Sequence, residues 1–197
     1  MNFLKILPLS RVRLDVLLEI YAEREDYLRN IAKKLKINPS LAFNVLNRLY
    51  DAKFTMKKRV GKEVQYSLNK NRDYEILTKL LEEYHLEKIL DRSKILKTAI
   101  GLLLNNKELI NSSYKIYLFG SYVLGDYTKR SDIDILFANE NRKLVGKTCR
   151  EISAIMGNKL DPLIYTKKKF KSDLLKQEPL LNSIVNNVKN RAIIQEK

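Results

Sequence analysis

The sequence predicts an α+β protein built from two parts, and three observations lead to that class. Apolar residues recur at helical spacing in both halves of the chain. Short β-compatible runs interrupt these helical patterns in both halves. The length of 197 residues suffices for one large domain or two small ones, and 45% hydrophobic residues is an ordinary globular share.

Positive charge dominates the composition. Lys and Arg total 38 against 23 Asp and Glu, so the formal net charge is +15. Residues 1–72 hold 16 basic and 7 acidic residues, a net +9, and residues 73–197 hold the remaining +6. This surplus favours a polyanionic or phosphate-bearing partner. A general enrichment in lysine, with 26 Lys against 12 Arg, is the alternative explanation.

The composition also excludes several kinds of chemistry. Cys149 is the one cysteine, which excludes an intramolecular disulfide and a cysteine-based zinc site. His85 is the one histidine, so chemistry that needs paired histidines is excluded. No apolar run approaches the roughly 18 residues of a membrane span, and Met1–Pro8 lacks a signal-peptide pattern. We therefore expect a soluble cytoplasmic protein with no membrane partner.

A polar stretch, Asn69–Asp73, marks the expected joint between the two parts. We expect a first domain over residues 1–72, a connecting helix over residues 73–90 and a second domain over residues 91–197.

Helices followed by a hairpin are predicted for the first part. Helical spacing predicts helices over Arg11–Glu23 and Tyr27–Leu35. Pro39 disfavours helical geometry at the residue before it, and Ser40 is the expected N-cap of a third helix. One face of that helix carries Leu41, Ala42, Val45, Leu46 and Leu49. Two β-compatible runs follow, Phe54–Val60 and Val64–Leu68.

This order resembles a winged helix-turn-helix domain over about residues 8–70. The resemblance implies that the third helix reads double-stranded DNA and that the hairpin is a basic wing on the phosphates. The expected DNA-binding residues are Ser40, Phe43, Asn44, Asn47 and Arg48 on the helix, and Lys57, Lys58, Arg59 and Lys62 on the wing. Lys53 stands where a glycine usually ends the helix. A winged helix that docks proteins or dimerises without DNA is the alternative.

The second part alternates helical and strand patterns. Helical spacing predicts helices over residues 74–84 and 89–104, and the polar residues 105–113 end this pattern. It predicts further helices over residues 144–156 and over residues 172–188, the last with a break at Pro179. The predicted strands are Lys115–Phe119, Ile133–Phe137, Leu160–Tyr165 and a short final strand at Ala192–Ile194.

Two carboxylates carry the most specific signal. Side chains two residues apart in a strand face the same side, so Asp132 and Asp134 project together. Such a pair repels itself unless a cation neutralises it, and Mg²⁺ suits oxygen ligands together with substrate phosphates. Gly120 permits a close backbone approach, and Ser121 can open a helix whose amides face a phosphate. An ordinary solvated strand face is the alternative.

The spacing of Gly120-Ser121 and Asp132-Ile133-Asp134 resembles the nucleotidyltransferase superfamily that includes DNA polymerase beta, and most closely its minimal members. The resemblance spans roughly residues 86–194 and implies a small mixed sheet flanked by helices. It implies a third carboxylate, Asp161, and two Mg²⁺ ions held by Asp132, Asp134 and Asp161. It also implies that Asp161 draws the proton from the acceptor, and that Gly120 and Ser121 position the phosphates of an NTP substrate such as ATP.

The same resemblance implies transfer of a nucleotidyl group to a hydroxyl on a protein or RNA acceptor. Some minimal nucleotidyltransferases resemble antitoxins, which leaves a small helical toxin, as well as a homodimer, among the partners to test.

The sequence departs from the family pattern at two places. Leu124 stands where the family often has an arginine, and Lys129 or Arg130 is the expected substitute near the phosphates. Pro162 follows Asp161 and removes a strand donor, which suits an edge strand. These departures keep a second function open: a DNA-binding transcriptional regulator whose second domain is a non-catalytic nucleotide sensor or a dimerisation module.

Overall fold

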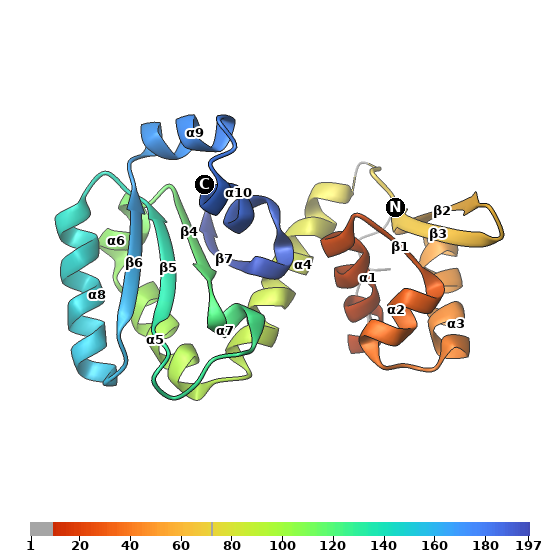
Figure 1. Cartoon of the computed structure of the whole chain (residues 1–197), viewed down its shortest axis with the longest axis horizontal. Coiled ribbons are helices and arrows are strands. Elements are labelled where there is room, and N and C mark those ends of the chain that lie inside the picture. The colour runs from red at the N-terminus through yellow and green to blue at the C-terminus, as the bar shows by residue number, and fades with distance from the viewer. Residues whose placement is uncertain (1–9, 72) are drawn as a thin grey trace. The chain divides into compact units, whose positions relative to one another are not determined.

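The chain divides into two compact units, Met1–Tyr84 and His85–Lys197. The computed structural model describes residues 10–71 and 73–197, and each unit combines helices with one small sheet (Figure 1). The predicted α+β class is confirmed. The expectation for Met1–Pro8 lies outside the described residues. In the described ranges, no helix is both long and apolar enough to cross a membrane.

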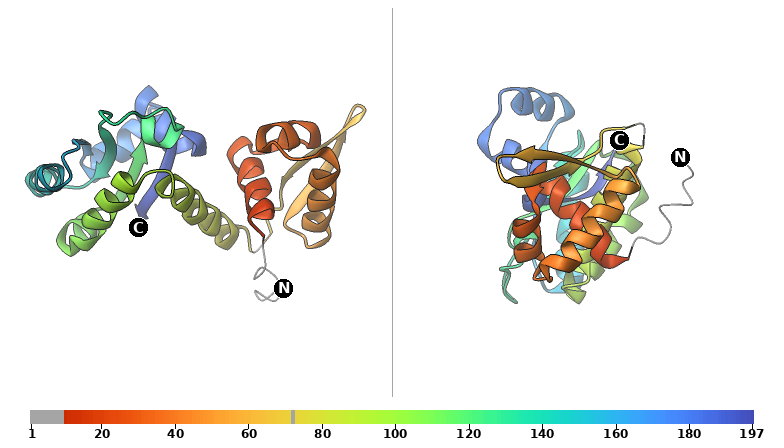
Figure 2. Two further views of the ribbon diagram at one scale, coloured as in Figure 1. Left: turned by 90° about the horizontal axis from the view of Figure 1, so that it is seen from below. Right: turned by 90° about the vertical axis from the view of Figure 1, so that its right-hand side faces the viewer.

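In residues 10–71 and 73–84, the first unit contains three helices, a three-stranded sheet and the beginning of a fourth helix. Its elements are α1 (Arg11–Glu23), β1 (Glu25–Tyr27), α2 (Leu28–Leu35), α3 (Pro39–Asp51), β2 (Thr55–Val60), β3 (Glu63–Leu68) and the first part of α4 (Tyr74–Leu90). The strands are antiparallel in the order β1-β3-β2. The β2–β3 hairpin projects away from the helices (Figure 2, left). This is the predicted winged helix-turn-helix arrangement.

Helix α3 has the predicted inner face with one exception. Its buried residues are Ala42, Val45, Leu46 and Leu49, while Leu41 is 43% exposed and was wrongly assigned to that face. The N-cap is also different from the prediction. Asn38, not Ser40, caps the helix, because its side-chain oxygen accepts a hydrogen bond from the Ser40 N–H at 2.8 Å and Pro39 is the first helical residue.

Strand β1 is an element that the sequence pattern did not predict. It has three residues, of which only Asp26 is buried, and it exists because Asp26 pairs with Tyr66 of β3. A strand this short carries too little alternation to be seen in the sequence, and pairing with a distant strand creates it.

The end of helix α3 holds a lysine in a conformation that glycine prefers. Lys53 has φ +67°. Its N–H donates a hydrogen bond to the Tyr50 carbonyl, and the Phe54 N–H donates to the Leu49 carbonyl, both at 2.9 Å. The side-chain amides of Asn69 and Asn71 donate to the Lys53 carbonyl at 3.1 and 3.2 Å. Helix α3 therefore ends with a left-handed residue, as such helices commonly do, but this residue is a lysine and not a glycine.

We expect Lys53→Gly to stabilise the first unit by about 0.5–1 kcal/mol, because glycine adopts a positive φ without steric cost. Urea unfolding measures the change. Lys53→Ala is the control, since alanine pays the same left-handed penalty and loses the lysine side chain as well. A gain in both variants would contradict the explanation, because it would assign the effect to loss of the lysine charge.

The second unit is a four-stranded mixed sheet with helices on both faces. After the end of α4 come α5 (Lys94–Asn105), α6 (Lys107–Ser112), β4 (Lys115–Phe119), α7 (Ser121–Leu124), β5 (Ile133–Ala138), α8 (Arg142–Met156), β6 (Leu160–Tyr165), α9 (Lys167–Leu175), α10 (Pro179–Asn186), the short 3-10 helix η2 (Val188–Asn190) and β7 (Arg191–Glu196). The order is β6-β5-β4-β7, with β5 and β6 parallel and the other pairs antiparallel.

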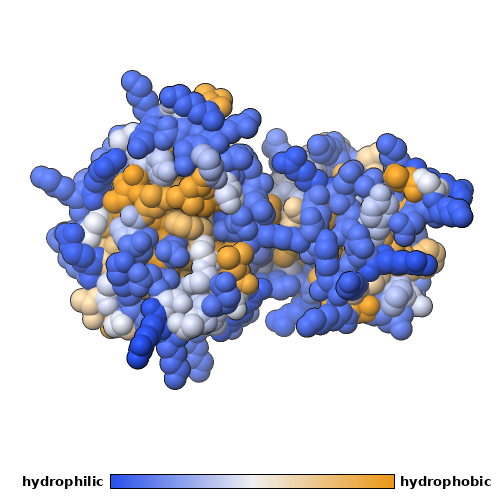
Figure 3. Space-filling model, viewed as in Figure 1, coloured by the Kyte–Doolittle hydropathy of each residue, from blue (hydrophilic) through white to orange (hydrophobic). Residues whose placement is uncertain are grey.

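Alternation along the strands separates two cores. Ile133, Ile135 and Phe137 of β5 pack into the larger core, which includes buried residues of α5 and α8. Leu136 and Ala138 face the smaller core, with Phe170 of α9 and buried residues of α10. Figure 3 shows hydrophobic surface in the second unit, and Phe119, Leu163 and Ile193 are partly buried residues packed against the smaller core.

Three helical predictions need correction. The pattern expected over residues 89–104 is interrupted, since α4 ends at Leu90 and the Ser93 side chain caps a new helix, α5, that begins at Lys94. Residues 105–113, expected to be a polar end, include α6, because the Asn106 side chain caps it and Leu109 is buried. The expected 172–188 helix is α9 and α10, and α9 begins five residues earlier, at Lys167. The break at Pro179 is confirmed, with the proline at the first position of α10.

Candidate functional site

Strand pairing brings the three predicted carboxylates to one end of the second unit's sheet. Asp134 lies opposite Asp161 in the parallel pair of β5 and β6, and opposite Phe119 in the antiparallel pair of β4 and β5. Asp132 comes two residues before Asp134, directly ahead of β5. The three aspartates thus lie where β5 and β6 begin and β4 ends, beside α7 (Figure 1). Strand β6 is one of the two edge strands of the sheet, the position that Pro162 favours.

The Gly120-Ser121 turn packs against one of these carboxylates. Gly120 has φ +74° and ψ −155°, a conformation that is open essentially to glycine alone. A Cβ on Gly120 would lie 2.1 Å from Oδ2 of Asp134, far inside contact distance. Helix α7 starts at Ser121 immediately afterwards. The glycine therefore serves two purposes, the backbone turn and the close approach to Asp134.

A lysine that the sequence analysis missed lies among the aspartates. Lys159 Nζ is 2.8 Å from Asp132 Oδ2 and 3.0 Å from Asp161 Oδ1. It comes two residues before Asp161, and strand alternation at this spacing is the signal that could have found it. Hydrogen bonds to Asp132 and then Asp161 raise the pKa of the Lys159 ammonium, so it stays charged.

The electrostatics of the cluster favour a bound cation. Burial, followed by the negative charges of Asp161 and Asp132, raises the pKa of Asp134, although Lys159 opposes this. The native state therefore binds Asp134's proton more tightly than the unfolded chain. The contribution of Asp134 to the free energy of unfolding therefore falls as pH rises from the pKa of this group in the unfolded chain through its raised pKa in the native state. Three carboxylates at the adjoining ends of β5 and β6, two of them already bridged by an ammonium, are a donor set that fits Mg²⁺.

The predicted phosphate-binding residues lie in the loops around this cluster. Lys129 and Arg130 are exposed in the turn closed by Thr128 and Ser131. Leu124, in the place of the family arginine, is 58% exposed. The guanidinium of Arg92 contacts α7, where its Nη1 donates a hydrogen bond to the Val123 carbonyl at 3.3 Å. Sequence reasoning missed Arg92, which follows α4 and lies far from the motif in the chain.

The predicted DNA-binding residues of the first unit are presented to solvent. Phe43 is 51% exposed, Ser40, Asn44 and Arg48 are exposed, and Asn47 is half-buried. All four predicted wing residues, Lys57, Lys58, Arg59 and Lys62, are exposed. Lys57 Nζ lies 4.1 Å from the centre of the Tyr50 ring of α3, a contact between the wing and this helix.

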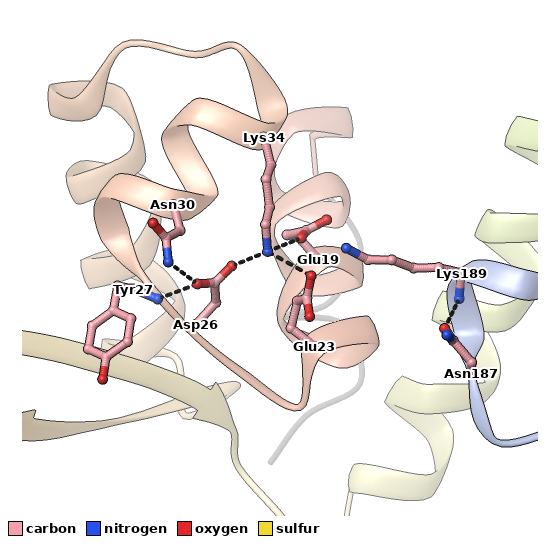
Figure 4. A network of polar contacts seen from close by, with 8 residues as sticks. All are labelled: Glu19, Glu23, Asp26, Tyr27, Asn30, Lys34, Asn187 and Lys189. Atoms are coloured by element: carbon pink, nitrogen blue, oxygen red, sulfur yellow. Dashed lines mark hydrogen bonds and ion pairs between the residues drawn. The ribbon is translucent and has the colours of Figure 1, made fainter. Parts of the chain in front are cut away.

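A second acidic cluster lies in the first unit, where one lysine contacts all three of its carboxylates (Figure 4). Among the described residues, Glu19, Glu23 and Asp26 are the three acidic side chains whose carboxylate oxygens all lie within 4.8 Å of one another. Lys34 Nζ contacts them at 3.0, 2.7 and 2.7 Å respectively. Burial lowers the pKa of Lys34, but the hydrogen bonds to Asp26, Glu23 and Glu19 outweigh it and raise the pKa. This cluster supports the fold.

Comparison with known proteins gives a family match for the second unit. Residues 101–194 match the family model described as "Nucleotidyltransferase domain". That range contains the Gly120-Ser121 turn and all three aspartates, as the sequence resemblance implied. A search of curated proteins finds no match to the chain.

Solved structures with similarity to the chain include a transcriptional repressor, Lactococcus lactis ZitR and a toxin–antitoxin. The AntR antimony-specific transcriptional repressor is 20% identical over 46% of this chain and 78% of its own, with a TM-score of 0.38. A mutant form of Lactococcus lactis ZitR is 24% identical over 44% of this chain and 58% of its own, with a TM-score of 0.37. A toxin–antitoxin with AMP-PNP is 18% identical over 58% of this chain and 73% of its own, with a TM-score of 0.32.

Proposed function

We propose that this chain, which contains a nucleotidyltransferase domain over residues 101–194, transfers a nucleotidyl group from an NTP to a hydroxyl group. The observation that carries the proposal is the strand register, because Asp134 lies opposite Asp161 and Gly120 packs against Asp134. Two carboxylates on neighbouring strands and a glycine turn against one of them provide oxygen ligands beside a backbone that a phosphate can approach.

In the proposed reaction, an acceptor oxygen bonds to the α-phosphorus of the NTP while the bond from that phosphorus to the bridging oxygen of the β-phosphate breaks. Pyrophosphate leaves, and the carboxylate of Asp161 takes the acceptor proton. Asp132, Asp134 and Asp161 would hold two Mg²⁺ ions, which stabilise charge on the attacking and leaving oxygens when bound. The Gly120-Ser121 turn positions the β- and γ-phosphates. Half-buried Phe119, opposite Asp134, offers an apolar surface suited to a nucleobase.

Incubation of the protein with Mg²⁺ and each of the four labelled NTPs tests this reaction, with separate protein and RNA fractions as acceptors. We expect label transfer, with Asp132→Asn plus Asp134→Asn reducing it by at least about 100-fold, because the donor set loses two charges. The double variant should stay folded, since burial and neighbouring charges already penalise the ionised Asp134.

Asp91→Asn is the matched control, because the Asp91 side chain is 64% exposed and pairs only weakly, with Lys97 at 3.2 Å. It should transfer label at the wild-type rate. Equal transfer by wild type and the double variant would overturn the assignment of the aspartates. Absence of transfer with every NTP and both acceptor fractions would favour the nucleotide-sensing regulator instead.

We further propose that the winged helix binds double-stranded DNA, with α3 in the major groove and the wing on the phosphates. The support is the exposed basic set Lys57, Lys58, Arg59 and Lys62 on a hairpin beside α3. Base contacts would come from Asn44, Asn47 and Arg48, whose side-chain types can donate to base edges. The label-transfer experiment identifies the acceptor, whether it is a protein or an RNA.

We expect Lys58→Glu plus Arg59→Glu to weaken duplex binding by roughly 10-fold or more and to reduce its salt dependence, because two phosphate contacts are lost. Fluorescence anisotropy with a random duplex, at several salt concentrations, measures both quantities. Lys143→Glu plus Lys147→Glu on α8 applies the same change of charge outside the winged helix. A duplex affinity that survives the wing variant, or falls equally in the α8 control, would contradict the wing assignment.

A further inference from the structure

The ammonium of Lys159 bridges two carboxylates that the proposed reaction needs for its metal ions. Its distances to Asp132 Oδ2 and Asp161 Oδ1 are 2.8 and 3.0 Å, so the pair is drawn together by a cation that the chain itself supplies. Removing this cation would leave two like charges facing each other at the strand ends. Lys159 therefore organises the cluster, but it also occupies the lone pairs that a metal ion would use.

Hydrogen bonds hold the main chain at Lys159, while its side chain bridges the two carboxylates at the protein surface. The Lys159 carbonyl accepts a hydrogen bond at 2.8 Å from the N–H of Ile133, the residue between Asp132 and Asp134. The neighbouring Asn158 side chain donates to the Lys129 carbonyl at 3.2 Å. By contrast, the Lys159 side chain is 60% exposed. It can leave the carboxylates by rotamer change, with no movement of the strand.

We propose that Lys159 is a positioning residue that keeps the aspartates together before substrate arrives and then moves to the triphosphate. This inference rests on the proposed function. A metal ion alone must compete with the ammonium for Asp132 and Asp161. When a metal-bound triphosphate is present, the displaced Lys159 ammonium would instead pair with its phosphate oxygens. Lys159 should therefore weaken the binding of metal alone and strengthen the binding of metal with nucleotide.

The test measures two affinities of the full-length protein that Lys159 is expected to shift in opposite directions. Mn²⁺ alone is titrated and followed by electron paramagnetic resonance, and a preformed Mn²⁺ complex of a non-hydrolysable ATP analogue is titrated by calorimetry. We expect Lys159→Met to bind Mn²⁺ alone roughly three- to tenfold more tightly, because two exposed ion pairs no longer compete. The same variant should bind the Mn²⁺–analogue complex several-fold more weakly.

Two variants separate charge from structure. Lys159→Arg keeps a cation at the site. It should bind Mn²⁺ alone, and the Mn²⁺–analogue complex, with affinities close to those of the wild type. Lys147→Met removes one positive charge from the exposed face of α8, where Lys147 lies 3.8 Å from Glu151, and should change neither. Mn²⁺ binding that persists in the Asp132→Asn plus Asp134→Asn variant is subtracted, which removes any contribution from other acidic groups.

The outcomes distinguish this inference from the proposed function. If Lys159→Met and wild type bind Mn²⁺ equally, or if both affinities fall together, the positioning role is overturned while the metal site stands. If neither protein shows Mn²⁺ binding that depends on Asp132 and Asp134, the proposed metal-dependent reaction fails together with this inference. The positioning role is established if Lys159→Met shifts the two affinities in opposite directions and Lys159→Arg restores both to near the wild-type values.

Discussion

Replacement of Gly120 by alanine is expected to disable the candidate site and destabilise the second unit by about 2–3 kcal/mol or more. The backbone conformation at φ +74° and ψ −155° carries a cost of about 1–3 kcal/mol for a residue with a Cβ. The new Cβ would also lie 2.1 Å from Asp134 Oδ2 and 3.0 Å from its Cγ. The aspartate must therefore turn away, so label transfer should fall at least about 100-fold. Urea unfolding and the label-transfer assay measure the two effects.

Two further variants separate the clash from the backbone strain. Gly101→Ala is the control, because its added Cβ meets nothing within 4 Å and alanine in a helix stabilises by roughly 0.5–1 kcal/mol. In an Asp134→Ala background, Gly120→Ala should cost less than in wild type, since the clashing carboxylate is absent. Equal costs in the two backgrounds would mean that Gly120 does not pack against Asp134 in solution.

Loss of the Lys34 ammonium is expected to have the largest effect on the first unit. Lys34→Met would leave Asp26, which is only 5% exposed, next to two glutamates without the cation that contacts all three. Breaking a fully buried ion pair costs about 3–5 kcal/mol. The Lys34 side chain is 38% exposed, so solvent screening reduces the expected loss to about 2 kcal/mol at neutral pH. Urea unfolding at neutral pH measures it.

The salt dependence of this loss identifies its cause. Salt screens interactions between charged groups, so the difference between Lys34→Met and wild type should shrink as the salt concentration rises. Lys33→Met on the same helix removes one exposed charge and should change stability by no more than about 0.5 kcal/mol. A loss of equal size at low and high salt, or in the Lys33 control, would show that side-chain packing and not the carboxylates is responsible.

Local patterns predicted many elements correctly. Helix α1 and strands β4 and β6 have the predicted bounds, because their apolar periodicity is strong and their ends carry clear signals. The outward face of α3 also followed from its buried positions. The short elements β1 and α6 were missed, since β1 depends on pairing with β3 and α6 on one cap and one buried leucine.

For the candidate site, the sequence by itself determined the motif. The Gly120-Ser121 dipeptide and the two-residue spacing of Asp132 and Asp134 can be found in the sequence, and the spacing predicts a shared side because strand alternation is a local property. The family resemblance added Asp161 to this motif. Tertiary structure alone decided which of these groups meet. The parallel pairing of β5 with β6 sets Asp134 opposite Asp161, and the path of the chain into β6 brings Lys159 between Asp132 and Asp161. Such contacts join residues about 27 positions apart, and the pairing of strands, which no local periodicity encodes, creates them.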